Sequence, residues 1–161
     1  MAREYVLERK QLIRRPLEEV FAFFSDVGNL EAITPPWLYF QILTPRPILI
    51  QAGMLIDYRI RLCGIPLKWR TKIDSYEPLV RFSDTQVRGP YQFWHHTHEF
   101  KATAEGVLMT DHVRYAIPLG PLGVVARWLF VRRQLQQIFD YRAAKIETLL
   151  SPTMIPASSA S

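Results

Sequence analysis

The feature that most constrains the fold is a two-residue alternation of apolar and polar side chains across residues 54–116. In the clearest segment Ile56, Tyr58, Ile60 and Leu62 alternate with polar and charged residues. Successive side chains of a strand point to opposite faces, so each such segment predicts a strand with one buried face. Turn residues separate the segments at short intervals, which indicates consecutive hairpins. The sequence therefore predicts a curved antiparallel meander with one apolar face.

The alternation stops at residue 118, where the chain changes to a helical period. Residues 118–123 hold two prolines and two glycines, and a predicted helix follows to about residue 150. Its apolar residues recur at helical spacing: Val125, Trp128, Leu129, Leu135, Ile138, Phe139, Ile146 and Leu149. Such a helix must bury its stripe, and the concave face of the meander is the available surface. We therefore expect the stripe to pack on that face.

The segments before the meander complete the predicted order. Residues 5–14 alternate as a strand, and residues 16–25 and 29–33 predict two short helices. Residues 37–43 are apolar and aromatic and predict a further strand. The predicted class is α+β, with a curved antiparallel sheet of about seven strands, two short helices after strand 1 and a long C-terminal helix.

The composition predicts one globular domain. The chain has 161 residues, of which 48% are hydrophobic and 22% charged, and no internal repeat is visible. We place the domain at residues 1–150. Residues 151–161 are rich in Pro, Ser and Ala and predict a flexible C-terminal tail.

The charge balance favours contact with anionic surfaces. Lys and Arg number 20 against 15 Asp and Glu, a net charge of +5. The basic residues are scattered and not interleaved with aromatics, so nucleic acid is not an expected partner.

Cys63 is the single cysteine, which excludes an internal disulfide and favours a reducing compartment. We expect it to be a small buried residue. A charged N-terminus without an apolar leader, and the absence of a long apolar run, complete the expectation of a cytoplasmic protein.

The last predicted hairpin places several polar side chains on the inward face. If Glu105 and Gly106 form its turn, His98 lies opposite Val113 and His96 opposite Tyr115. The inward face then holds Trp94, His96, His98, Phe100, Asp111, Val113 and Tyr115. A loop at residues 89–91 would add Asp84 and Gln86, opposite His96 and Trp94.

These polar groups leave more than one interpretation open, because polar groups in an apolar interior must be paired or wetted. They can satisfy one another, orient the polar head of a ligand, or act as an acid–base pair. Zinc accepts two histidines and a carboxylate. However, the chain has no HExxH, no paired CxxC and no third histidine at a fixed spacing. We therefore predict neither a metal nor another cofactor.

Four segments carry a resemblance to a known superfamily. They are RPLEEVFAFFSD at residues 15–26, NLEAITPPW at 29–37, FSDTQVRGPYQFWHHTHEF at 82–100 and TDHVRYAIP at 110–118. The chain resembles the SRPBCC superfamily over about residues 3–150, and within it the bacterial ligand-binding branch labelled cyclase/dehydrase-like. Relatives there include START lipid-transfer domains, birch-pollen-allergen-like proteins and polyketide aromatase/cyclases. The resemblance implies a helix-grip fold, in which the C-terminal helix closes the sheet over a deep cavity, but it transfers no catalytic motif.

The sequence and this resemblance together predict the binding or transport of a small hydrophobic or lipid-like ligand in an internal cavity. The predicted ligand-binding residues are Tyr58, Trp69, Asp84, Gln86, Trp94, His96, His98, Phe100, Asp111, Val113, Tyr115, Leu129 and Phe139. The alternative is a polyketide cyclase/dehydratase-like enzyme that uses cavity His and Asp groups. A third hypothesis is transient contact of residues 118–133 with an anionic membrane surface, through Trp128, Phe130 and the flanking arginines. Its competing interpretation is a helix start packed on the sheet. No oligomeric state is predicted.

Overall fold

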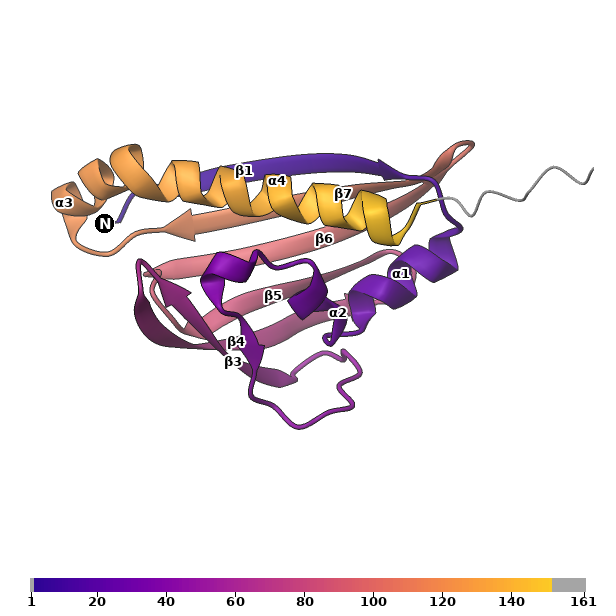
Figure 1. The fold of residues 1–161 in the computed structure, drawn as a ribbon, viewed down its shortest axis with the longest axis horizontal. Coiled ribbons are helices and arrows are strands. Elements are labelled where there is room, and N and C mark those ends of the chain that lie inside the picture. The colour runs from indigo at the N-terminus through magenta and orange to yellow at the C-terminus, as the bar shows by residue number, and fades with distance from the viewer. Residues whose placement is uncertain (1, 152–161) are drawn as a thin grey trace, which may run out of the picture.

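The computed structural model describes residues 2–151, and its main feature is an antiparallel seven-stranded sheet within that range. The strand order is β1-β7-β6-β5-β4-β3-β2 (Figure 1). Strands β2 to β7 therefore lie beside their neighbours in the chain, and the last strand, β7, also pairs with the first, β1. The strands are β1 (Glu4–Ile13), β2 (Gln41–Ile42), β3 (Leu55–Leu62), β4 (Ile65–Glu77), β5 (Arg81–Arg88), β6 (Phe93–Thr103) and β7 (Gly106–Ala116). The predicted antiparallel meander is confirmed.

Two short helices follow β1, as predicted. They are α1 (Leu17–Ser25) and α2 (Asn29–Ala32). Pro16 fixes the backbone just before α1, and Glu18 and Glu19 lie in its first turn, where the helix dipole favours acidic groups. The predicted strand at 37–43 is mostly wrong. A short 3-10 helix, η1 (Pro36–Leu38), begins at the two prolines, which leaves only β2 as strand.

The C-terminal helical segment runs as α3 (Gly120–Ala126), a π-helical turn η2 (Arg127–Val131) and α4 (Arg132–Leu149). In Figure 1, α4 lies along the sheet and ends near α1, while α3 lies at the opposite end of the molecule. Polar contacts hold α4 to β1. Arg9 pairs with Asp140, and the Gln11 side chain donates a hydrogen bond to the carbonyl of Ala143 at 2.9 Å.

The buried apolar side chains form two clusters between the sheet and these helices. The first surrounds α1 and includes Phe21, Phe82 and Phe100, whose rings contact one another. The second lies under α4 and consists of Trp94, Val113, Tyr115, Leu135 and Phe139. The polar residues of β6 and β7 lie between the two clusters, since His98 packs against Phe82 of the first cluster and His96 contacts Phe139 of the second.

The predicted register of the β6–β7 hairpin is wrong by two residues. Thr103 pairs with Gly106, so Ala104 and Glu105 form the turn, and His98 lies opposite Asp111. The reason is the environment of Gly106. Its φ is +144°, and an added Cβ would lie 2.2 Å from the carbonyl oxygen of Ile13, so this glycine serves the close approach of β1. A two-residue shift keeps every side chain on its predicted face.

The predicted packing of the C-terminal helix is correct for its middle part only. Leu135, Phe139 and Ile146 are buried and Ile138 is partly buried, whereas Val125, Trp128 and Leu129 before them and Leu149 at the end are exposed. A π turn has more residues per turn than an α-helix, so η2 displaces the apolar stripe at this point. The start of the helical segment also extends to the end of the molecule (Figure 1).

Three further observations bear on the expectations. Cys63 is exposed, not buried, because it forms a tight turn with Gly64 between β3 and β4, where both residues have positive φ. Of the predicted tail at 151–161, all but Ser151 lies outside the described residues. No helix in residues 2–151 is long and apolar enough to cross a membrane.

Candidate functional site

The candidate site is a cavity of about 200 Å³. It lies between the concave face of β3–β6, the segment from α1 to β2, and α4. One water molecule needs roughly 10–15 Å³ of such space, so the cavity is far larger than a packing defect. Its walls are mainly apolar and aromatic, which matches the usual composition of small-molecule sites.

Seven of the predicted site residues line this cavity. They are Tyr58, Trp69, Asp84, Trp94, His96, His98 and Phe139. Period-two alternation brings the six strand residues together, because each strand contributes every second side chain to the same concave face, while Phe139 reaches the cavity from α4. The predicted pairing of Asp84 with His96 across β5 and β6 is observed.

The other predicted residues lie near the cavity or away from it. Gln86 binds the backbone of Tyr91 through both its amide nitrogen and its carbonyl oxygen. Phe100 packs in the first apolar cluster, and Val113 and Tyr115 are buried in the second. Leu129 is half-exposed on η2 and is not among the cavity-lining residues.

Sequence reasoning missed the part of the wall that the short helices supply. Phe23, Asn29, Leu30, Ile33 and Thr34 line the cavity from α1, α2 and the residues that follow α2. The available signal was the number of apolar residues in the segments that form α1 and α2, which is larger than one packing face of such short helices requires.

Arg142 was also missed, and it lines the cavity from α4. It follows Leu135 by seven residues and Phe139 by three, so it occupies the same helix face as these buried side chains. Its guanidinium lies 5.8 Å from the ring centres of both Phe24 and Phe139. Helical spacing would have identified it as an inward-facing cation.

The polar part of the site is a cluster of Asp84, His96, His98 and Asp111, which we call the His–Asp cluster. One carboxylate oxygen of Asp111 lies 2.8 Å from Nε2 of His96 and 2.9 Å from Nδ1 of His98. Nε2 of His98 lies 3.8 Å from Asp84. Asp111 does not line the cavity itself, so it contacts the two histidines from behind while they face the cavity.

The pKa values of the two histidines are shifted in opposite directions, because both are buried but His98 has the stronger carboxylate contacts. Desolvation, together with the neighbouring His98, lowers the pKa of His96 to about 4. Desolvation acts on His98 as well, but contacts with Asp111 and Asp84 outweigh it and raise the pKa of His98. The pKa of Asp111 is held well below its usual value, because the charge of Arg142 and the two histidines outweigh its burial. At neutral pH Asp111 is therefore a carboxylate and His96 a neutral imidazole.

The same cluster is the set of side chains that could hold a metal ion. Donor atoms of Asp84, His96 and His98 all lie within 4.8 Å of one another. Two imidazoles and a carboxylate suit zinc or ferrous iron. In such an arrangement Asp111 would orient the histidines as an outer carboxylate.

Two aromatic side chains add polar atoms to the wall. The Tyr58 hydroxyl donates a hydrogen bond to Thr71, and burial raises the pKa of Tyr58, so the phenol stays protonated. The indole nitrogen of Trp69 is buried and has no hydrogen-bond partner among the described residues. A buried N–H is normally paired, so Trp69 offers a donor to a bound molecule.

Comparison with known protein families gives one match for the sequence of this chain. A family model described as polyketide cyclase / dehydrase and lipid transport matches residues 13–140. No curated protein is similar enough in sequence to count as a match.

Several solved structures share the fold. A protein from Chromobacterium violaceum superposes with a TM-score of 0.71 at 14% identity, over 92% of this chain and 99% of that one. Ara h 8.0201 gives a TM-score of 0.63 at 16% identity, over 90% and 99% of the two chains. Major latex-like protein 151 from Panax ginseng gives 0.64 at 12% identity, over 92% and 99%. Identities this low show a common fold alone.

The family match and the architecture agree. The match covers most of the chain, and the solved structures share its curved sheet and long C-terminal helix. The chain therefore belongs to the polyketide cyclase / dehydrase and lipid transport family of the SRPBCC superfamily and has the helix-grip fold.

Proposed function

We propose that this protein binds and carries a small hydrophobic molecule that has one polar end. The observation that carries the proposal is the cavity, which has apolar walls and the His–Asp cluster on one side. Apolar contact would supply most of the affinity, at roughly 25 cal/mol per Å² buried before the costs of association.

The polar end of the ligand would lie against the cluster and Trp69. His98 and the Trp69 indole are part of the cavity wall and offer N–H donors, so a carbonyl, hydroxyl or carboxylate oxygen of the ligand suits them. Asp84 also lines the cavity, 3.8 Å from His98, and its carboxylate can accept a hydrogen bond from a ligand hydroxyl. The proposed ligand class is therefore an oxygenated lipid, isoprenoid or polyketide.

A pair of variants on α4 tests the proposal. Ile138 lines the cavity, and Gln137 beside it is exposed. Ile138→Trp adds bulk on the cavity side, and Gln137→Trp adds the same bulk on the solvent side. The measurement is the thermal shift of each protein with a panel of fatty acids, isoprenoids and aromatic polyketides. A ligand at about 100 times its Kd stabilises the folded state by roughly 2.7 kcal/mol.

We expect panel members to raise the Tm of the wild type and of Gln137→Trp, and to leave Ile138→Trp unchanged. Equal shifts in both variants would mean that the ligands bind elsewhere. The unliganded Tm of each variant shows whether the substitution has disturbed the fold.

A second candidate function is a polyketide cyclase/dehydratase-like reaction. The observation that favours it is the separation of the pKa values of His96 and His98, because neighbouring groups with divergent pKa values can divide acid and base roles. The test is turnover over a panel of polyketide and ester substrates, followed by His98→Gln and by His95→Gln as a control. His95 lies on the opposite face of β6 and does not line the cavity. Loss of activity in the first variant alone would support an enzyme, and no turnover by the wild type would reject it.

A further inference from the structure

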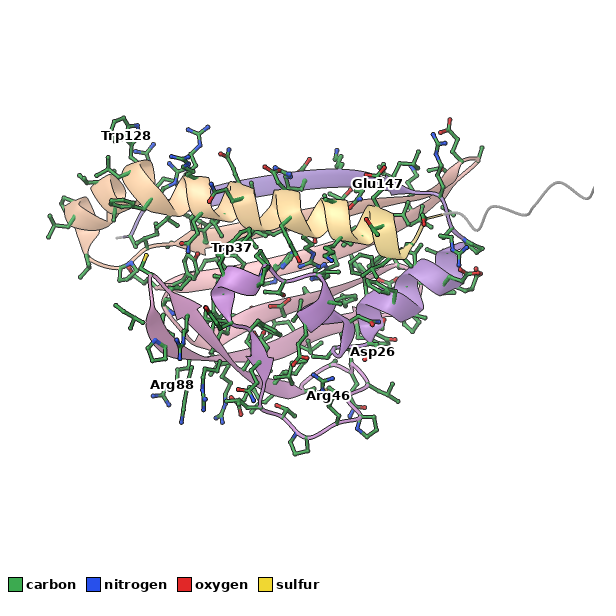
Figure 2. All side chains as sticks on the ribbon, viewed as in Figure 1. Asp26, Trp37, Arg46, Arg88, Trp128 and Glu147 are labelled. Atoms are coloured by element: carbon green, nitrogen blue, oxygen red, sulfur yellow. The ribbon has the colours of Figure 1, made fainter. Side chains whose placement is uncertain are left out.

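The start of the C-terminal helical segment exposes large apolar side chains. Leu119 and Leu122 are 72% exposed, Trp128 73% and Phe130 68%, and Val125 and Leu129 are about half-exposed. We call these six residues, together with Arg132 and Arg133, the α3–η2 face. Figure 2 shows Trp128 on the outer side of the helix, pointing away from the sheet. Single exposed apolar residues are ordinary, but a contiguous group of this size marks an interaction surface.

The fold holds this face outward through its inner side. Gly123 is buried, and an added Cβ there would lie 2.2 Å from the carbonyl oxygen of Pro118, so the helix backbone lies directly on the preceding chain. Arg127 points inward, with its guanidinium 3.7 Å from the ring centre of Tyr5 and its Nε donating to the Tyr115 hydroxyl at 3.3 Å. With this side anchored, the apolar side chains of α3 and η2 point to solvent.

The charge around the face is of one sign. Residues 112–139 contain no Asp or Glu, while Arg132 and Arg133 follow η2 directly and are exposed. Arg3 lies beside α3 as well, because it lines a recess with Gly120 and Val124. The next acidic residue along the chain, Asp140, is paired with Arg9. Within residues 112–139 the apolar group is therefore bordered by cations with no acidic residue interspersed, and Glu4, which follows Arg3, is paired with Arg114.

We propose that the α3–η2 face docks on an anionic phospholipid bilayer. Tryptophan and phenylalanine suit the boundary between headgroups and acyl chains, and arginines beside them attract acidic lipids. A second copy of this chain fits less well, because a two-fold contact would bring the arginines of both copies together. The proposal goes beyond ligand binding, since this face is separate from the cavity wall and would dock whether or not the cavity is filled.

The test is binding of the full chain to vesicles of phosphatidylcholine, with and without phosphatidylserine, measured by co-sedimentation. One variant joins Trp128→Ser and Phe130→Ser, and a second joins Arg132→Gln and Arg133→Gln. The matched control joins Leu49→Ser, at 78% exposure, with Arg88→Gln, whose position at the opposite side of the sheet is seen in Figure 2. All these positions are exposed, so the variants are expected to fold, and measurements of their circular dichroism and Tm check this expectation.

We expect the wild type and the control to bind the vesicles that contain phosphatidylserine and to bind phosphatidylcholine alone much more weakly. The arginine variant should bind about 25-fold less tightly, at roughly five-fold for each of the two charges removed. The aromatic variant should lose at least about ten-fold. Brominated acyl chains should quench the fluorescence of the wild type and should quench the aromatic variant less.

Three results would overturn the proposal. They are no binding of the wild type to either vesicle, equal binding by all variants, and self-association in light scattering that only the aromatic variant abolishes. The last would assign the face to a second copy of the chain. None of them affects the cavity, whose ligand is measured separately by thermal shift.

Discussion

At the scale of single residues, the account depends on one carboxylate that serves two histidines. Asp111 contacts His96 and His98 through the same oxygen, and all three side chains are buried. A buried charge is costly unless it is paired, and here the partners lie on the adjacent strand and on α4. The arrangement fixes which nitrogen of each histidine faces Asp111, so the remaining nitrogen is free for the cavity or for Asp84.

The two histidines should titrate in opposite directions from the ordinary histidine pKa of about 6.5. The raised pKa of His98 contributes stability that is present below pH 6.5 and is lost as pH rises through the folded value. The lowered pKa of His96 contributes stability that is present above pH 6.5 and is lost as pH falls toward about 4. NMR of ¹⁵N-labelled histidine side chains resolves both. A common midpoint near 6.5 would contradict the geometry of the cluster.

Removal of the charge of Asp111 should destabilise the fold. Asp111→Asn keeps the shape but removes the negative charge from two buried histidines and from Arg142. We expect the free energy of unfolding to fall by about 2–4 kcal/mol at pH 7 in urea denaturation.

The control for that variant is Asp140→Asn on α4. Asp140 pairs with Arg9 but is 64% exposed, and exposed ion pairs contribute less than about 1 kcal/mol. A similar loss in both variants would show that Asp111 is not a buried paired charge.

At the scale of elements, the C-terminal helical segment has a buried half and an exposed half. Leu135, Phe139 and Ile146 of α4 close the cavity and the core, while Trp128 and Phe130 of η2 remain in solvent. The π turn η2, which ends the exposed half, is an irregularity often found at functional positions.

Two phenylalanines of this segment should respond very differently to truncation. Phe139→Ala removes a buried ring that contacts His96, and we expect a loss of about 3–5 kcal/mol in the free energy of unfolding. Phe130→Ala, at 68% exposure, should change it by less than about 0.5 kcal/mol. Urea denaturation of both variants provides the measurement, and a comparable loss in the two would mean that the helix packs in another register.

The hairpin between β6 and β7 gives an independent prediction. Gly106→Ala would place a methyl group 2.2 Å from the backbone of Ile13, at a φ of +144°. We expect a loss of at least about 2 kcal/mol from strain and overpacking. Gly53→Ala, at a φ of +85° with open space around it, should cost less. Equal losses in thermal unfolding would mean that β1 does not approach Gly106 this closely.

The sequence predicts the elements better than it predicts their exact pairing. Alternation and turn residues identify β3 through β7, because side-chain direction is local information. The observed β6–β7 turn lies one residue before the predicted one, because Gly106 is needed for the close contact with Ile13, which is distant in sequence. The exposed helix start and the role of Arg142 depend likewise on where α4 meets the sheet. Alternation therefore predicted cavity residues on the strands. Those on α1 and α2, and Arg142 on α4, were missed, although helical spacing alone places Arg142 on the inward face of its helix.

At the scale of the whole molecule, the cavity results from how the sheet and helices are joined. The sheet curves, α4 spans its concave face, and the segment from α1 to β2 closes the remaining side (Figure 1). The two apolar clusters stabilise the two ends of this assembly, and the His–Asp cluster lies between them. The cavity is thus part of the architecture and needs no rearrangement of the core to exist.

The most direct test of the central claim is native mass spectrometry of freshly purified protein, followed by denaturing extraction of any bound molecule. The account predicts one apolar, oxygen-containing adduct per chain, present in the wild type and in Gln137→Trp and absent from Ile138→Trp. An adduct that persists in Ile138→Trp would contradict it. So would a wild-type protein that carries no adduct and is stabilised by no member of the lipid and polyketide panel.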